Sequence, residues 1–139
     1  MSTVYMIFAT GCQACEAFKQ QGLAELQRSL AADRIPSRVI DLPSTRSALS
    51  GADAWLNPLI GWFPFFIRVP LNQPEAASVF NGVRGARGEW VSAGKLTRTP
   101  ANIANWARTA VAGPGPGTFS IVAAQSPYYA NTAASRGGR

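Results

Sequence analysis

The 139-residue chain contains no histidine, only two cysteines and only two lysines. A structural zinc site needs four ligands, which come mostly from cysteine and histidine. This chain supplies half of such a set, so a metal site is disfavoured unless another subunit or a carboxylate completes it, and we expect neither a metal nor a cofactor. Two cysteines are also too few for a disulfide scaffold, which favours a catalytic or redox-sensing pair in a reducing compartment.

The sequence also lacks any apolar segment long enough to cross a bilayer, and no basic segment precedes its apolar first residues. We therefore expect no secretion and no membrane partner. The expected location is cytoplasmic, with incorporation into a large assembly such as a virion as the alternative. At 47% hydrophobic residues the chain is long enough for one domain with a core, and too short for two.

The net charge of +6 comes almost wholly from arginines, which are scattered singly along the chain. The densest basic group lies in a glycine-rich stretch that we expect to be an exposed loop, and it consists of Arg84, Arg87, Lys95 and Arg98. Such an excess permits contact with anionic surfaces, but no nucleic-acid-binding motif accompanies it. A solvated face is therefore favoured over nucleic acid as a partner.

Both cysteines lie in one motif, Cys12-Gln13-Ala14-Cys15, which follows the apolar run of residues 4–9. That run is short and rich in β-branched and aromatic residues, which is typical of a buried strand. From Gln13 to about Ala32 the apolar residues recur at the spacing of an amphipathic helix. The motif is therefore predicted at a strand-to-helix turn, where the helix N-terminus lowers the pKa of a thiol and stabilises its thiolate.

The two cysteines are predicted to have different roles. Cys12 lies at the first turn of the helix and is the expected nucleophile in disulfide exchange. Cys15 follows one turn later, close enough to form a disulfide with Cys12 or to resolve a mixed disulfide. The alternative is that both thiols are small buried hydrophobic groups. The spacing, the flanking Gly11 and the strand-helix context favour the redox pair.

Three later segments complete the pattern of elements. Residues 38–42 predict a second strand, which closes a β-α-β unit. Ser44 is a candidate N-cap for a second helix that ends at Asn57-Pro58. Thr99, followed by a proline at the first helical position, predicts the start of a last helix.

An aromatic-proline step opens the strongly β-forming run of residues 61–69. Proline lacks the N–H group that a central strand needs, so Pro64 is predicted at the start of this strand. The Phe63–Pro64 bond is a candidate for the cis form, which is rare and usually retained for a structural reason.

This order of strand, Cys-x-x-Cys, helix, strand, helix and aromatic-proline step resembles the thioredoxin-like superfamily, particularly thioredoxins and glutaredoxins, over residues 3–112. The resemblance implies a three-layer α/β fold with a central mixed sheet of about four strands flanked by helices. It implies a cis Pro64 beside the dithiol and a Phe63 backbone that holds an extended substrate segment. The expected substrate surface also includes Gly11, Gln13 and Trp62.

The motif departs from the thioredoxin pattern in two respects. Its Cys-Gln-Ala-Cys sequence lacks the tryptophan and proline of the thioredoxin motif, and Met6 stands where thioredoxins have a buried acid on the first strand. Glu16 is adjacent to Cys15, but a residue on the helix surface is expected to face solvent. Proton transfer is therefore expected to rely on water.

The rest of the chain divides into a domain of residues 1–112 and a Gly/Pro-rich extended tail of residues 113–139. The tail is expected to add little to the stability of the domain and to gain order from a protein partner. Residues 83–94 form a longer connection than the superfamily usually has. An added hairpin, a partner-binding loop and a loop without a function remain open.

Two functions from different classes follow from these observations. The first is a thiol–disulfide oxidoreductase that acts on a disulfide-containing protein or a low-molecular-weight thiol. The second is a structural component of a large assembly such as a virus shell, anchored by its tail, in which the dithiol is not catalytic. A fold alone does not decide between them, and the intact dithiol favours the first.

Overall fold

The computed structural model describes residues 2–70, 76–84, 86, 90–93 and 96–109, and within them the chain forms a mixed four-stranded sheet. The strands lie in the order β2-β1-β3-β4. The central strand β1 (Ser2–Ala9) pairs in parallel with β2 (Ser37–Leu42) and antiparallel with β3 (Phe65–Pro70), which in turn pairs antiparallel with β4 (Ser78–Val79). The strands predicted at residues 4–9, at residues 38–42 and within residues 61–69 are thus confirmed as β1, β2 and β3.

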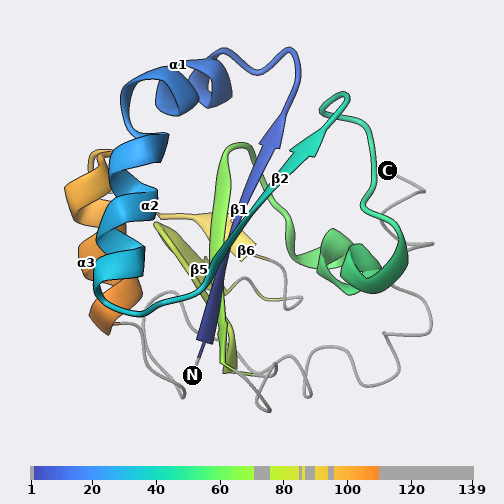
Figure 1. Ribbon diagram of the computed structural model, residues 1–139. Helices are drawn as coiled ribbons and strands as arrows, with labels where there is room; N and C mark the ends of the chain where they lie inside the picture. The colour runs from blue at the N-terminus through green and yellow to red at the C-terminus, as the bar shows by residue number, and fades with distance from the viewer. Residues whose placement is uncertain (1, 71–75, 85, 87–89, 94–95, 110–139) are drawn as a thin grey trace.

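Helical segments cover both faces of this sheet. Figure 1 shows α1 (Gln13–Gln21), α2 (Leu23–Ala32) and α3 (Pro100–Thr109) on one side, and the 3-10 helix η1 (Gly51–Leu59) on the other. The predicted α/β fold class, with a mixed sheet between layers of helix, is confirmed.

Each face of the sheet has its own hydrophobic core, because successive strand residues point to opposite sides. The helix-side core joins β1 and β3 to the three α-helices, and its buried residues include Met6, Phe8, Cys15, Phe18, Leu26, Leu30, Phe66 and Ile103. The η1-side core includes Ile7, Leu49, Leu56, Leu59, Phe65, Ile67 and Trp90. Cys15 therefore belongs to the helix-side core.

The single helix expected from Gln13 to about Ala32 is divided at Gly22. Pro100, the first residue of α3, packs against this point so closely that a Cβ atom on Gly22 would lie 2.8 Å from its Cγ atom. The N–H group of Gly22 still donates to the carbonyl oxygen of Phe18 at 2.8 Å. The helix is thus divided at the point where a distant segment, the start of α3, packs against it. Helical periodicity in the sequence does not predict such a contact.

The prediction of a second helix capped by Ser44 is wrong. The segment that forms, η1, begins at Gly51 after Ser50, is a 3-10 helix, and contains Pro58 instead of ending before it. The Ser44 hydroxyl oxygen instead accepts the N–H group of Arg46 at 3.2 Å, because serine side chains readily close local turns in competition with a helix.

A buried asparagine holds the loop before η1 in place. The Asn57 side chain accepts the N–H group of Leu49 at 2.8 Å and donates to the Leu49 carbonyl oxygen at 2.9 Å. Asn57 is fully buried and Leu49 nearly so. One side chain therefore satisfies both backbone groups of a residue that is closed off from water.

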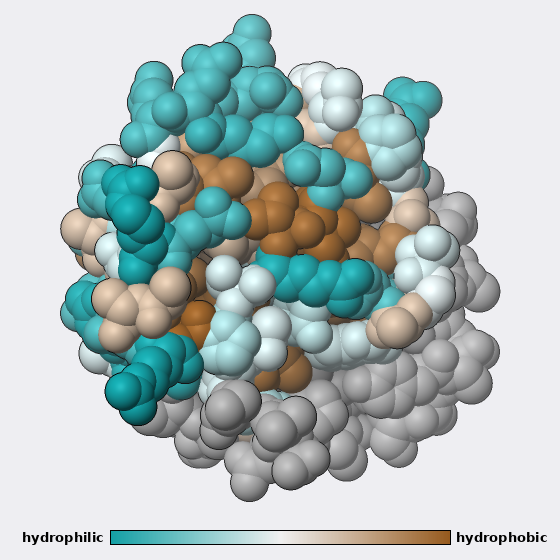
Figure 2. Space-filling model, in the orientation of Figure 1, coloured by the Kyte–Doolittle hydropathy of each residue, from teal (hydrophilic) through white to brown (hydrophobic). Residues whose placement is uncertain are grey.

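The edge strand β2 is tied to both helical layers by ion pairs. Arg38 contacts Asp53 of η1 at 2.8 Å, and Asp41 contacts Lys19 of α1 at 2.7 Å. On the face of the molecule that is turned to the viewer, Figure 2 shows apolar side chains in the middle and hydrophilic ones around them. Charged residues of this kind protect a sheet edge from pairing with another chain.

The longer connection after β4 contains a short hairpin. Strand β5 (Gly82–Arg84) pairs antiparallel with β6 (Trp90–Ser92), so one of the three alternatives for this region, an added hairpin, is present. The predicted tail, residues 113–139, lies outside the described residues. Within the described part of the chain, no helix combines the length and the apolar character needed to cross a membrane.

Candidate redox site

The dithiol lies in the turn between β1 and α1, at the end of the sheet where β1 and β2 both finish. The N–H group of Thr10 donates to Leu42 of β2 at 2.9 Å, and the N–H group of Cys12 donates to Ala9 at 3.3 Å. Between them Gly11 adopts a φ of +88°, in the left-handed region that favours glycine. This turn directs the chain from the central strand to the start of α1.

Cys12 is the N-cap residue of α1. Its backbone is extended, with φ −98° and ψ 110°, and its Sγ atom accepts the N–H group of Cys15 at 3.1 Å. Its carbonyl oxygen accepts the first helical hydrogen bond, from Glu16 at 3.1 Å. The sulfur thus occupies the place of a capping oxygen, where a helix N–H group and the positive end of the macrodipole favour negative charge.

Cys12 and Cys15 form a disulfide, and their Cα atoms are 5.2 Å apart. Cys15 is 0% exposed within the helix-side core, whereas Cys12 is only partly buried at the margin of that core. An incoming reagent can therefore approach Cys12 more readily than Cys15. This unequal burial agrees with the division of roles expected from the sequence.

The aromatic-proline step lies at the same end of the sheet as the dithiol. The Phe63–Pro64 peptide bond is cis, as predicted, and Pro64 is buried directly before β3. In the pairing of β1 with β3, Ile7 lies opposite Phe65, so the step is level with the last residues of β1. Phe63 and Cys12 both pack against the helix-side core.

Of the other residues of the expected substrate surface, Gln13 lies in the turn with the cysteines, whereas Trp62 lies against the η1-side core. Gln13 is exposed at the first position of α1, beside Gly11 and Cys12 in the same turn. Trp62 packs against the η1-side core, with its ring centroid 5.1 Å from that of Phe65. The structure brings Gly11, Cys12 and Gln13 together, and their roles in binding remain predictions.

Lys19, one helical turn beyond Cys15, forms ion pairs with two carboxylates. The Nζ atom of Lys19 lies 2.7 Å from an Asp41 carboxylate oxygen and 3.6 Å from a Glu16 carboxylate oxygen. The hydrogen bond with Asp41 is the main cause that raises the pKa of Lys19 above its usual value, so the lysine stays protonated. The ammonium group also lies 5.6 Å from the centre of the Phe8 ring.

No acid faces Cys15 from the central strand, because Met6 is fully buried in the helix-side core at that position. The nearby carboxylates of Glu16 and Asp41 are about half exposed and both pair with Lys19. Sequence reasoning missed the contact of Lys19 with Asp41, since it joins residues 22 positions apart. The alternation along β2 was the available signal, because it places Asp41 on the side of the helices.

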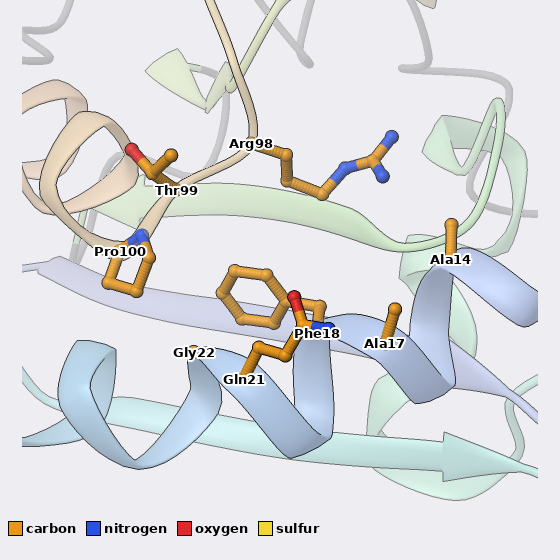
Figure 3. Close-up of a pocket in the computed structure, with 8 residues that line it drawn as sticks. All are labelled: Ala14, Ala17, Phe18, Gln21, Gly22, Arg98, Thr99 and Pro100. Carbon is orange, nitrogen blue, oxygen red and sulfur yellow. The ribbon is translucent and has the colours of Figure 1, made fainter.

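A groove lies between α1 and the segment that precedes α3. Its cavity volume is about 410 Å³, and it is lined by Ala14, Ala17, Phe18, Gln21, Gly22, Arg98, Thr99 and Pro100. Figure 3 shows these side chains around the groove, with Ala14 at one end and Gly22 with Pro100 at the other. Ala14 lies between the two cysteines in the Cys-Gln-Ala-Cys motif, so one end of the groove is formed by a residue of this motif.

Sequence reasoning found the helix start that forms one wall of this groove, but not the groove itself. Thr99 is the predicted N-cap of α3, and its hydroxyl oxygen accepts the N–H group of Asn102 at 3.1 Å. Pro100 is the first residue of α3, also as predicted. Arg98 was assigned to an exposed loop, and it is exposed.

Among the residues that the structure describes, no three histidine, cysteine or acidic side chains gather where they could hold a metal ion. Comparison of the chain with protein-family models, with curated proteins and with solved structures finds no match.

Proposed function

We propose that this protein is a thiol–disulfide oxidoreductase of the thioredoxin-like type, in which Cys12 and Cys15 are the redox couple. The observation that carries the proposal is the placement of the two sulfurs. One caps a helix N-terminus at the protein surface, and the other is buried behind it and joined to it by a disulfide. This arrangement supplies an accessible nucleophile with a built-in second thiol.

The reaction follows from the chemistry of exchange. In the reduced protein, the Cys12 thiolate attacks one sulfur of a substrate disulfide. A new bond forms to Cys12, the substrate disulfide breaks, and the departing sulfur takes up a proton. The Cys15 thiolate then attacks the Cys12 sulfur and releases the second substrate thiol. Two electrons pass to the substrate, and the protein is left with its Cys12–Cys15 disulfide; the reverse sequence oxidises a dithiol substrate.

The same geometry supports separate roles for the surrounding residues. The Cys15 N–H group that donates to the Cys12 sulfur stabilises a thiolate there, because a charged acceptor strengthens the hydrogen bond. Met6 cannot accept a proton, so we assign proton removal from Cys15 to water. Gly11, Gln13, Trp62 and the Phe63-Pro64 step are proposed as the surface that receives the substrate chain.

The remaining parts of the proposal concern the context of this activity. The catalytic domain would comprise residues 1–112, followed by a tail of residues 113–139 that binds a protein partner. The location would be cytoplasmic, and the substrates disulfide-containing proteins or low-molecular-weight thiols. The alternative, a structural component of a large assembly with an inert dithiol, differs from this proposal in having no exchange activity.

The test is turnover of a model protein disulfide by the full-length chain, with dithiothreitol as the reductant. We expect reduction faster than dithiothreitol alone achieves, because an activated thiolate at Cys12 attacks disulfides faster than an ordinary thiol. Protein whose cysteines were alkylated after reduction is the matched control and should add nothing. A rate equal to that of dithiothreitol alone would reject the oxidoreductase and favour the structural alternative.

A further inference from the structure

The groove runs along α1 from Ala14, which lies within the Cys-Gln-Ala-Cys motif, to Gly22 and Pro100 at its other end. On α1 its wall is a single helical stripe of residues 14, 17, 18 and 21, with the nearly buried Phe18 ring at its base. At the far end, Pro100 packs against Gly22 so closely that even a Cβ atom there would lie 2.8 Å from the proline. The opposite end of the groove lies at Ala14, two positions after Cys12 in the chain.

Of the described residues that line this groove, Arg98 alone is charged. Figure 3 shows its guanidinium group extending along the groove toward Ala14, away from Thr99 and Pro100. Arg98 makes no ion pair with any residue that the structure describes, whereas Arg38, Arg108 and Lys19 each have a carboxylate partner. Among the described residues, this cation therefore has no carboxylate partner.

Within the described part of the chain, the acidic residue of α1 already has a cationic partner. Glu16 lies on α1 but pairs with Lys19, which in turn contacts Asp41 on the edge strand β2. None of the described residues that line the groove is acidic. The groove therefore combines an apolar base, two small alanine positions and one unpaired guanidinium group, which complements an apolar chain segment that carries a carboxylate.

We propose that this groove binds the extended segment next to the disulfide of a protein substrate, and that Arg98 selects segments with an acidic residue close to the reactive cysteine. This inference rests on the proposed function, because it places the substrate sulfur at Cys12. The segment enters at Ala14, lies over Phe18, and presents its carboxylate to Arg98. Arg98 is a specificity-determining residue in this account and takes no part in the exchange step.

The test compares symmetrical peptide disulfides, each made by oxidising a peptide with one cysteine and with Glu, Gln or Lys two residues to either side. The full-length reduced protein should reduce the Glu peptide about threefold faster in kcat/KM than the Gln peptide, a modest preference because an exposed ion pair is worth little. The Lys peptide should be the slowest. Arg98→Glu should reverse the order of the Glu and Lys peptides.

Two further variants distinguish an effect of the groove on the peptide preference from an effect of the protein's net charge. Arg28→Glu changes the net charge equally at an exposed position on α2, and it should keep the preference for the Glu peptide. Ala17→Leu fills the groove from an exposed helical position and should lower kcat/KM for the Glu peptide. A preference that survives in Arg98→Glu, or that Arg28→Glu removes equally, overturns the inference.

The remaining outcomes distinguish this inference from the proposed function. If small disulfides with carboxylates beside the sulfur show the preference and the peptides do not, the groove binds low-molecular-weight thiols and the peptide assignment is wrong. If no disulfide is reduced, the proposed function fails. Binding to the groove is then measured by NMR chemical shifts, with a Glu peptide in which serine replaces the cysteine. Shifts at Ala14, Ala17 and Gln21 that weaken in Arg98→Glu would uphold it, and their absence would overturn it.

Discussion

Replacement of Cys12 by serine should reduce disulfide exchange to the rate measured without the protein, whereas replacement of Cys15 should trap the protein on its substrate. Cys12 is the accessible sulfur, so its loss removes the nucleophile. Cys15 is buried behind it, so Cys15→Ser still allows the first attack and removes only the thiol that releases the product. Electrophoresis without reductant would show the mixed disulfide as a band that disappears when reductant is added.

Cys15→Ala is the matched control for this pair of variants. Serine places a hydroxyl group among apolar side chains at position 15, and alanine does not, so both should trap the substrate if the missing thiol is the cause. Each variant is first checked for a cooperative unfolding transition. Mixed disulfides that accumulate with Cys12→Ser, and not with the variants of Cys15, would reverse the two roles.

Asn57→Ala should lower the free energy of unfolding by about 2–4 kcal/mol, because it leaves two buried backbone groups without partners. The Asn57 side chain satisfies both the N–H group and the carbonyl oxygen of Leu49. Water does not reach these groups, since Asn57 is 0% and Leu49 6% exposed. Urea denaturation followed by circular dichroism measures the difference.

Asn105→Ala provides the comparison, since Asn105 is an exposed residue of α3 and its replacement should change stability by no more than about 0.5 kcal/mol. The two variants remove the same atoms from different surroundings. Equal effects at positions 57 and 105 would show that the bonds to Leu49 do not hold the loop before η1.

The parts of the fold that the sequence predicted correctly depend on local signals. The first strand, the turn at Gly11 and the N-cap at Thr99 each follow from a few neighbouring residues whose side chains or conformations suit one structure. The dithiol was found in the same way, because its two cysteines are three positions apart on one helical turn.

The parts that sequence reasoning missed depend on contacts between distant segments. Gly22 divides the long helix because Pro100 packs against it from 78 positions away. The Ser44 prediction failed for another reason, because a serine that closes a local turn, here with Arg46, is the same residue type that caps a helix. The groove could not be predicted from local patterns, because its two walls are formed by residues 14–22 and 98–100, which come together only in the folded chain.

The rate of alkylation of the reduced, full-length protein measures whether Cys12 is an activated nucleophile and Cys15 its buried partner. Labelling over a range of pH, with mass spectrometry to assign each site, gives the reactivity of both thiols. We expect Cys12 to be labelled first, with a rate that rises at a pH well below about 8.5, where a free cysteine titrates. Labelling of Cys15 ahead of Cys12, or a Cys12 that reacts like a free cysteine, would contradict it.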